Sequence, residues 1–316
     1  MTVNLKNPIY LSETSAREHI EALRWADGAY CPRCEQKDTI VKLGGKAEAK
    51  GQYNCRACRQ KFTVTVGTIF ERSHIPLTKW VLGFHLMTAS KKGISAHQLH
   101  RMLDITYKSA WFMAHRIREA MAPAKGSTGP LGGKGKIVEA DETYIGGKDK
   151  NKHANKRPRK GRGGVSKEIV VSLVERNGAV RSFHVANVSG KTLRPVLVTQ
   201  IDRASTLMTD EGGQYATFGH EFAAHQSVNH GIGEYVRGSW HSNTVENYFS
   251  ILKRGIVGTY HHVSEAHLKR YLAEFDFRYS ERTGLGVSDA MRAEKAIQGS
   301  SGKRLTYRRP RYAAIA

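Results

Sequence analysis

The chain has 316 residues, which is enough for two domains or for one large domain with appendages. It carries 50 Lys and Arg residues against 28 Asp and Glu residues, a formal net charge of +22, and 40% of its residues are hydrophobic. That apolar content supports packed cores and excludes a disordered chain. The charge favours a nucleic-acid partner over an anionic membrane, because basic side chains displace counterions from phosphate backbones.

Two features of the sequence argue against secretion and membrane insertion. The first residues, "MTVNLKNPIY", lack the apolar stretch of a secretory signal. The longest apolar-rich stretch, "WVLGFHLMTA" at 80–89, is too short to cross a bilayer and has helical periodicity. We therefore expect no membrane partner.

All four cysteines of the chain fall in two CxxC pairs within residues 20–70. The pairs are "CPRC" (Cys31 and Cys34) and "CRAC" (Cys55 and Cys58), with 20 residues between them. This spacing predicts one structural Zn²⁺ held by four thiolates, flanked by short strands in a zinc ribbon. A closed shell of four thiolates leaves no position for substrate. Two disulfides or free thiols are the alternative, which the absence of a secretory signal disfavours.

Residues 71–122 have the pattern of packed helices. Ser95 is expected to cap a short helix that ends at Met102, and a longer helix is expected from Thr106 after a break near Asp104. This arrangement predicts a helix-turn-helix-like DNA-binding region, although an ordinary helical hairpin fits the pattern equally well. Some basic residues of the longer helix are expected outside its buried stripe or at the edge of that stripe. Those proposed to contact DNA are Lys108, Arg116 and Arg118.

A linker rich in Gly, Pro and Lys is expected at 123–136, followed by an α/β domain at 137–285. Its elements are predicted in the order β-β-β-α-β-β-α, with Asn177-Gly178 as a hairpin turn and "HQSVNH" as a short edge strand. Asp141 lies near the end of the first strand, Asp210 ends the fourth, and Glu246 lies on a helix that follows. Together these elements predict a mixed five-stranded sheet.

That order resembles the RNase H-like fold, in which acids from the first strand, the fourth strand and a later helix converge. The resemblance implies that Asp141, Asp210 and Glu246 bind Mg²⁺ or Mn²⁺. Two such cations, held about 4 Å apart by oxygen ligands, clamp the attacking and leaving oxygens of a phosphoryl transfer. Glu246 follows Asp210 by 36 residues, and Lys253 follows Glu246 by seven on the same helical face.

Alternatives remain for each acid. Asn243 is expected to be the helix N-cap with Glu246 as its capping-box partner, and Asn243 is also an alternative third ligand. Glu139 shares the strand face of Asp141 by alternation, whereas Glu142 points away. The acid beside Asp210 that could replace it is Glu211.

The chain resembles bacterial insertion-sequence DDE transposases that combine an N-terminal zinc ribbon with an RNase H-like catalytic domain. The matching stretches are "CPRC…CRAC", "FTVTVGTIFERSHIPLTKW", "VEADETYIGGK", "TDEGGQY", "HSNTVENYFSILKRGIVGTYHHVS" and "HLKRYLAEFDFRYSER". The resemblance implies binding to the terminal inverted repeats of the element, and magnesium-dependent cleavage and strand transfer. A non-catalytic DNA-binding regulator and a structure-specific nuclease are the alternatives.

The same resemblance implies double-stranded DNA as partner, both element ends and target, and a homodimer or larger assembly on DNA. We expect a cytoplasmic protein associated with the bacterial nucleoid. The segment 148–164 is expected to follow DNA phosphates as a basic loop, although a solvated loop fits equally well. Its proposed DNA contacts are Lys156, Arg157, Arg159 and Lys160.

The end of the chain has two further expected parts. A helix is predicted from Ser264, covering the sheet through Leu268, Leu272 and Phe275, with Glu274 and Asp276 as surface acids. Residues 286–316 are expected to form a basic C-terminal tail.

Overall fold

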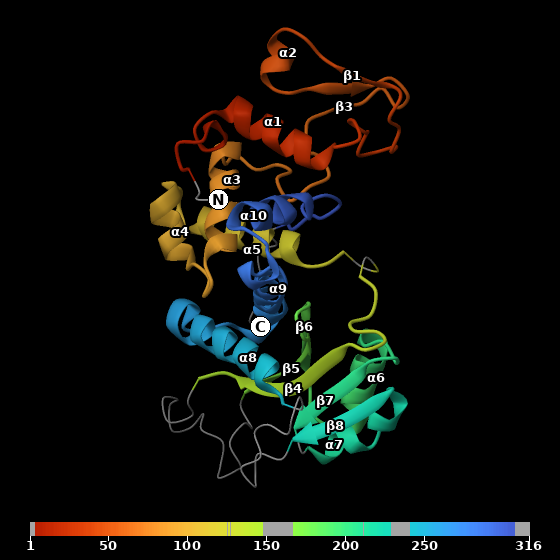
Figure 1. The fold of residues 1–316 in the computed structure, drawn as a ribbon. Coiled ribbons are helices and arrows are strands. Elements are labelled where there is room, and N and C mark those ends of the chain that lie inside the picture. The colour runs from red at the N-terminus through yellow and green to blue at the C-terminus, as the bar shows by residue number, and fades with distance from the viewer. Residues whose placement is uncertain are drawn as a thin grey trace, which may run out of the picture. The chain divides into compact units, whose positions relative to one another are not determined.

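The computed structural model describes residues 4–124, 126, 128–147, 167–210, 212–228 and 241–306. The chain divides into two compact units (Figure 1). The first unit comprises residues 1–90, 94–122 and 288–316, and the second comprises residues 91–93 and 123–287. The C-terminal part of the chain therefore returns to the first unit. The predicted DNA contacts Lys156, Arg157, Arg159 and Lys160 lie outside the described residues.

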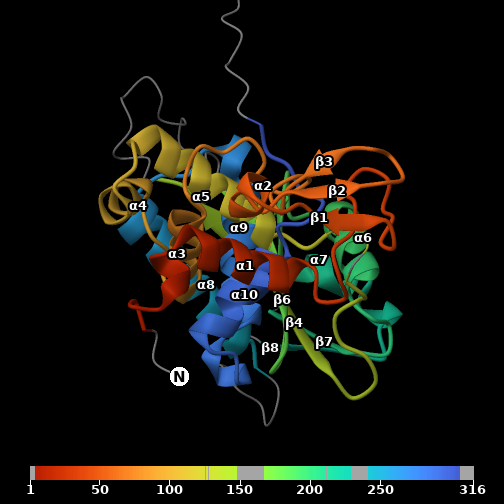
Figure 2. The same cartoon turned by 90° about the horizontal axis from the view of Figure 1, so that it is seen from above.

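The first unit begins with helices and the predicted ribbon. A short 3₁₀ helix, η1 (Pro8–Tyr10), precedes α1 (Glu13–Arg24), which was not predicted; it begins where the Ser12 hydroxyl accepts a hydrogen bond from the Ser15 amide. Strands β1 (Ile40–Lys42), β2 (Tyr53–Cys55) and β3 (Lys61–Phe62) pair antiparallel in that order (Figure 2), and α2 (Lys46–Ala49) connects β1 to β2. Trp25, at the end of α1, packs edge-on against Tyr53 and Phe62.

Three helices follow in the first unit: α3 (Leu77–Ala89), α4 (Ala96–Leu103) and α5 (Tyr107–Met121). The predicted cap at Ser95 is confirmed, because its hydroxyl accepts from the Gln98 amide. The longer helix was predicted from Thr106, which proves to be its N-cap, with a hydroxyl that accepts from the Ser109 amide. Asp104 adopts a left-handed conformation with φ of 47° in the break between α4 and α5. The predicted helix–turn–helix sequence of elements is therefore present.

The predicted orientation of two arginines on α5 is wrong. Arg116 is only 7% exposed and Arg118 only 2% exposed. The Arg116 guanidinium donates to the backbone carbonyls of Ile69 and Glu71, at 2.6 and 3.2 Å, and to that of Leu305 at 3.2 Å. Chain segments that are distant in sequence therefore cover the side of α5 that periodicity assigned to solvent. Lys108, in contrast, is exposed.

The prediction of a basic tail from residue 286 missed a helix. Residues Asp289–Gln298 form α10, which begins where the Ser288 hydroxyl accepts from the Met291 amide. The helix packs against α3. Arg292, 5% exposed, donates to the Thr88 carbonyl of α3 and to the Asp289 carboxylate. Apolar packing and a buried arginine therefore hold α10 in the first unit.

The second unit is built on a mixed five-stranded sheet, as predicted, and the order of its strands is β6-β5-β4-β7-β8 (Figure 1). Its strands are β4 (Ile137–Ile145), β5 (Glu168–Glu175), β6 (Val180–Val185), β7 (Thr206–Asp210) and β8 (Ala224–Val228). β4, β5 and β6 pair antiparallel, whereas β7 pairs parallel with both β4 and β8. The change from antiparallel to parallel pairing thus occurs at β4, in the middle of the sheet.

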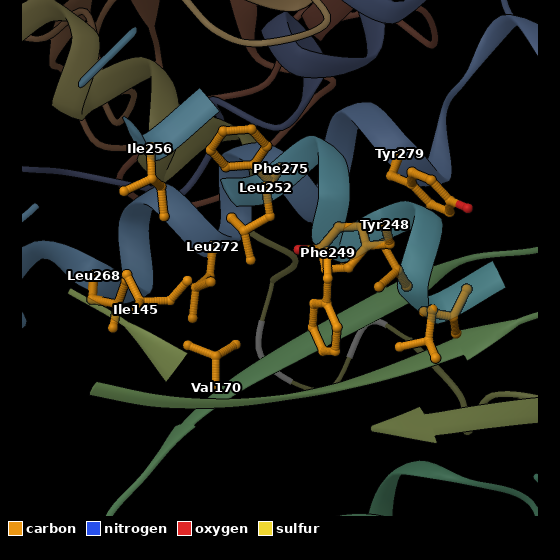
Figure 3. Packing of buried hydrophobic residues seen from close by; sticks show 13 residues of the cluster. Ile145, Val170, Tyr248, Phe249, Leu252, Ile256, Leu268, Leu272, Phe275 and Tyr279 are labelled. Atoms are coloured by element: carbon orange, nitrogen blue, oxygen red, sulfur yellow. The ribbon is translucent and has the colours of Figure 1, made fainter. Parts of the chain in front are cut away.

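Helices cover both faces of this sheet. On one face, α6 (Gly190–Gln200) and α7 (Gly213–Ala216) share a core with strand residues such as Val138 and Leu207. Phe218 and Phe222, which flank η4 (Gly219–Glu221), belong to the same core. On the other face, α8 (Asn243–Gly255) and α9 (Glu265–Ser280) pack over β5, where Figure 3 shows Leu252 and Leu272 above Val170. Two short elements complete the unit, η6 (Ile256–Tyr260) and η7 (Thr283–Leu285).

Two acids of α9 predicted at the surface are instead enclosed. Glu274 is fully buried and bonds with Arg278 and with the Tyr260 hydroxyl. Asp276 accepts hydrogen bonds from the backbone amide and hydroxyl of Ser182, at 2.8 and 2.6 Å, and from the Tyr248 hydroxyl at 2.6 Å. Burial raises the pKa of Asp276 to about 6. The burial of Asp276 depends on hydrogen-bond partners from β6 and α8, which the helical periodicity of α9 cannot indicate.

Replacing Asp276 by alanine should destabilise the second unit. The change leaves the Ser182 amide and the Tyr248 hydroxyl without their acceptor, so we expect a loss of about 2–4 kcal/mol in the free energy of unfolding. Urea unfolding followed by circular dichroism measures it. A loss below about 0.5 kcal/mol, as for an ordinary surface residue, would contradict the structural role of Asp276.

Candidate active site and zinc site

The four cysteines meet at one end of the ribbon. Their sulfur atoms all lie within 4.8 Å of one another, and the pairs Cys31–Cys58 and Cys34–Cys55 are each separated by 3.6 Å. None of the four is in a disulfide. Four thiolates around one zinc, with Zn–S bonds of about 2.3 Å, lie about 3.8 Å apart. The geometry therefore fits a structural zinc ion.

In the second unit, the parallel pairing of β4 and β7 brings two predicted acids together. Glu139 is aligned with Met208, so continuing the register by two residues places Asp141 beside Asp210. Both acids are half-buried. Side chains alternate along a strand, and Ile145 belongs to the core beneath α8 and α9, so Asp141 points to that same face.

Helix α8 supplies the third predicted acid. Glu246 lies in its first turn, and Val245 and Leu252 are fully buried on the opposite side of the helix. The residues of the helix face predicted to carry the site are all exposed: Asn243, Glu246, Ser250 and Lys253. The amphipathic pattern of α8 therefore turns an acidic and basic face away from the core.

The N-cap of α8 differs from the prediction. Ser242, not Asn243, is the N-cap, and its carbonyl accepts from the Glu246 amide at 3.1 Å. The Ser242 hydroxyl also donates to the Glu246 carboxylate, at 3.1 Å. The helix begins one residue earlier than predicted, and the Asn243 amide donates to His241 Nδ1 at 3.3 Å. Asn243 is thus the first helical residue.

The pKa of Asp141 responds both to its burial and to the acids around it. Burial, together with the nearby carboxylates of Asp210, Glu142 and Glu246, raises its pKa to about 7, against the effect of a hydrogen bond from the Glu142 amide. Like charges at this spacing disfavour ionisation unless a cation neutralises them. Asp210 and Glu246 are therefore close enough to Asp141 to act on it electrostatically.

The donor set fits hard divalent cations. Magnesium and manganese prefer carboxylate oxygens, and a pair of ions about 4 Å apart needs ligands more widely spread than one zinc does. In the described part of the chain, the groups of three or more potential ligands within 4.8 Å of one another are the four cysteines and a set on β5, β6 and α9. That second set is Glu168, His184 and Glu265. The three acids are less tightly grouped.

The neighbouring glutamates occupy opposite faces of β4, as alternation predicted. The Glu142 carboxylate accepts from the Tyr215 hydroxyl at 2.5 Å and from Gln214 Nε2 at 3.0 Å. These donors belong to α7, directly after β7, where the Gly212 amide also donates to the Asp210 carboxylate at 3.0 Å. Glu142 thus holds α7, the segment that follows Asp210, against β4. Sequence reasoning treated Glu142 only as a rival to Asp141 and did not single out Gln214 or Tyr215.

Comparisons with known proteins agree with this arrangement. The model of the ISXO2-like transposase domain matches residues 130–280, and that of the transposase zinc-ribbon domain matches residues 11–61. The chain therefore carries both domains of a transposase of this kind. A relative from Halobacterium salinarum, described as "Uncharacterized protein in transposable element ISH50", is 29% identical over 280 residues, which are 85% of this chain and 91% of that protein.

Within the transposase, each matched domain contains one of the two sites. The zinc-ribbon match includes all four cysteines, and the transposase-domain match includes Asp141, Asp210 and Glu246. Both domains are of kinds that act on DNA. A search of the described residues found no helix with the length and hydropathy of a membrane span.

Removal of zinc should unfold the ribbon alone. The ribbon has only short strands and depends on its metal, whereas the second unit has its own apolar cores. We expect a zinc chelator to expose the amides of residues 25–70 to hydrogen exchange while β4–β7 stay protected. Simultaneous loss of protection in both regions would contradict this independence.

Replacing Asp141 by asparagine should stabilise the transposase when magnesium is absent. Its pKa in the folded protein, about 7, lies above the usual value of 3.8. When the pKa of a carboxyl group is higher in the folded protein than in the unfolded chain, ionisation of the group destabilises the folded state at any pH above the unfolded pKa. For Asp141, this loss of stability grows between about pH 4 and pH 7. At pH 8, with zinc retained, we expect a gain on the order of 1 kcal/mol.

Urea unfolding at pH 8 and pH 5 tests this expectation, because the gain should shrink at the lower pH. Adding Mg²⁺ should also stabilise the wild type more than the variant. Equal stability of the two proteins at both pH values would show that Asp141 is not in a crowded acidic site.

Proposed function

We propose that this transposase cleaves the ends of an insertion sequence and transfers them to target DNA by metal-dependent phosphoryl transfer. The observation that carries the proposal is the β4–β7 register, which sets Asp141 beside Asp210 within the matched transposase domain. The electrostatic effect of Glu246 of α8 on Asp141 supports it. Carboxylates from three separate elements, among them an Asp141 whose pKa is raised by burial and by neighbouring acids, are suited to divalent cations.

In the proposed reaction, Asp141, Asp210 and Glu246 hold Mg²⁺ or Mn²⁺, and Asn243 lies one turn away as a further oxygen donor. When bound, the cations supply charge neutralisation and activate the attacking oxygen. Water attacks a phosphodiester at the element end, and the bond to the 3′ oxygen breaks, so that this oxygen leaves as a hydroxyl. That hydroxyl then attacks target DNA. Lys253, exposed on the same face of α8, contacts a DNA phosphate.

We propose double-stranded DNA, at the terminal inverted repeats and at the target, as the partner. The net charge of +22 supports this, and Lys108 is exposed on α5. Arg116 and Arg118 are buried and give the proposal no support. Because two ends must be held together, we propose a homodimer or larger assembly on DNA.

Replacing Asp210 by asparagine should abolish catalysis and leave DNA binding intact. The change keeps the size of the side chain but removes a ligand charge, so we expect end cleavage to fall by about 10³-fold or more. Labelled duplexes that carry the terminal repeats of the element, incubated with Mn²⁺ or Mg²⁺, measure cleavage, and gel shift measures binding. Asp202→Asn, in a loop before β7, is the matched control.

Two outcomes would favour the alternative functions. Binding without any cleavage, equal in wild type and Asp210→Asn, would identify a non-catalytic DNA-binding regulator. Cleavage without joining of the freed end to a second duplex would identify a nuclease.

A further inference from the structure

The most completely enclosed acid of β4 is one that the proposed chemistry does not use. Glu139 is fully buried. One carboxylate oxygen accepts from the backbone amides of Thr244 and Val245, at 2.8 and 2.9 Å. The other accepts from the Thr244 hydroxyl at 2.8 Å and from Arg176 Nε at 2.6 Å. Glu139 is therefore hydrogen-bonded to the first turn of α8.

Two physical effects keep this buried carboxylate in place. The amides at a helix N-terminus carry partial positive charge and favour an anion. Arg176 supplies a full positive charge, and its Nη2 also donates to the His241 carbonyl at 2.7 Å, just before α8. Glu139 and Arg176 together thus hold both the last residue before the N-cap and the first turn of the helix.

The position of this contact in the chain connects two of the proposed metal ligands. Glu139 is two residues before Asp141 on the same face of β4, and Thr244 is two residues before Glu246 on α8. Tyr279 of α9 donates to the Thr244 carbonyl at 3.3 Å from the other side. A strand and a single helical turn are both stiff, so the separation of the two ligands is set through Glu139.

We infer that Glu139 is a positioning residue that fixes the Glu246 carboxylate relative to Asp141. This inference rests on the proposed function. Residues that orient metal ligands without touching the metal change affinity by about 10–100-fold when they are replaced. A glutamine in place of Glu139 would offer one oxygen instead of two and would set an amide nitrogen against donors, which releases the first turn of α8.

Binding of Mn²⁺ to the zinc-loaded full chain, in the absence of DNA, tests the inference directly. The binding that is lost in Asp141→Asn defines the site, which separates it from any ion held by Glu168, His184 and Glu265. We expect Glu139→Gln to raise the Kd for Mn²⁺ at this site by about tenfold. In Glu139→Gln/Glu246→Gln, the Kd should stay within about threefold of that in Glu246→Gln alone, because Glu139 acts through Glu246.

Glu274→Gln is the matched control for a purely structural effect. Glu274 is also a fully buried acid paired with an arginine in the second unit, but it bonds within α9 and to Tyr260 rather than to α8. Its replacement should lower thermal stability and leave the Kd for Mn²⁺ unchanged. Both glutamine variants are measured below their unfolding temperatures, with native circular dichroism as the criterion.

The outcomes separate the inference from the proposed function. If Asp141→Asn and Asp210→Asn weaken Mn²⁺ binding but a folded Glu139→Gln does not, the inference is wrong and the proposed function stands. If Asp141→Asn and Asp210→Asn both leave Mn²⁺ binding unchanged, the proposed metal site itself is wrong. If Glu139→Gln does not fold, Thr244→Val, which removes one donor to Glu139, replaces it. A Kd equal to that of the wild type would then reject the inference.

Discussion

The parallel pairing of β4 with β7 is the constraint on which the arrangement of the second unit depends. It places two acids side by side at the middle of the sheet, on the face that α8 and α9 cover. Strand β4 carries Asp141 between two glutamates that serve opposite faces: Glu139 binds the start of α8, and Glu142 binds the segment after Asp210. Side chains from one short stretch of β4 are therefore hydrogen-bonded to the first turn of α8 and to α7, the helix that follows Asp210.

Features of the structure that depend on local sequence patterns could be predicted from the sequence. The cysteine spacing, the cap at Ser95, the helix start near Thr106 and the order of strands along the chain all follow from short-range rules, and each agrees with the structure. The amphipathic face of α8 was likewise predictable, because Val245 and Leu252 alternate with the exposed residues at helical spacing. The site residues could be chosen, but their roles remain proposals.

The burial of a charged side chain could not be predicted from the sequence where the side chain packs against a distant part of the chain. Periodicity assigned Arg116, Glu274 and Asp276 to the surface because a charge is normally solvated. Each is instead enclosed by partners between 4 and 189 residues away, as the Glu274–Arg278 and Arg116–Leu305 contacts show. The contacts of Glu139 with α8, about a hundred residues later in the chain, were hidden for the same reason.

The return of α10 to the first unit has a consequence for how the protein is made. A ribosome delivers residues in order, and the first unit includes residues 288–298, which emerge after the whole second unit. Helix α3, which packs against α10, is synthesised about two hundred residues earlier. Its Thr88 carbonyl cannot accept the hydrogen bond from Arg292 until α10 has been made. A chain that stops before residue 288 therefore holds every proposed catalytic acid yet has an incomplete first unit.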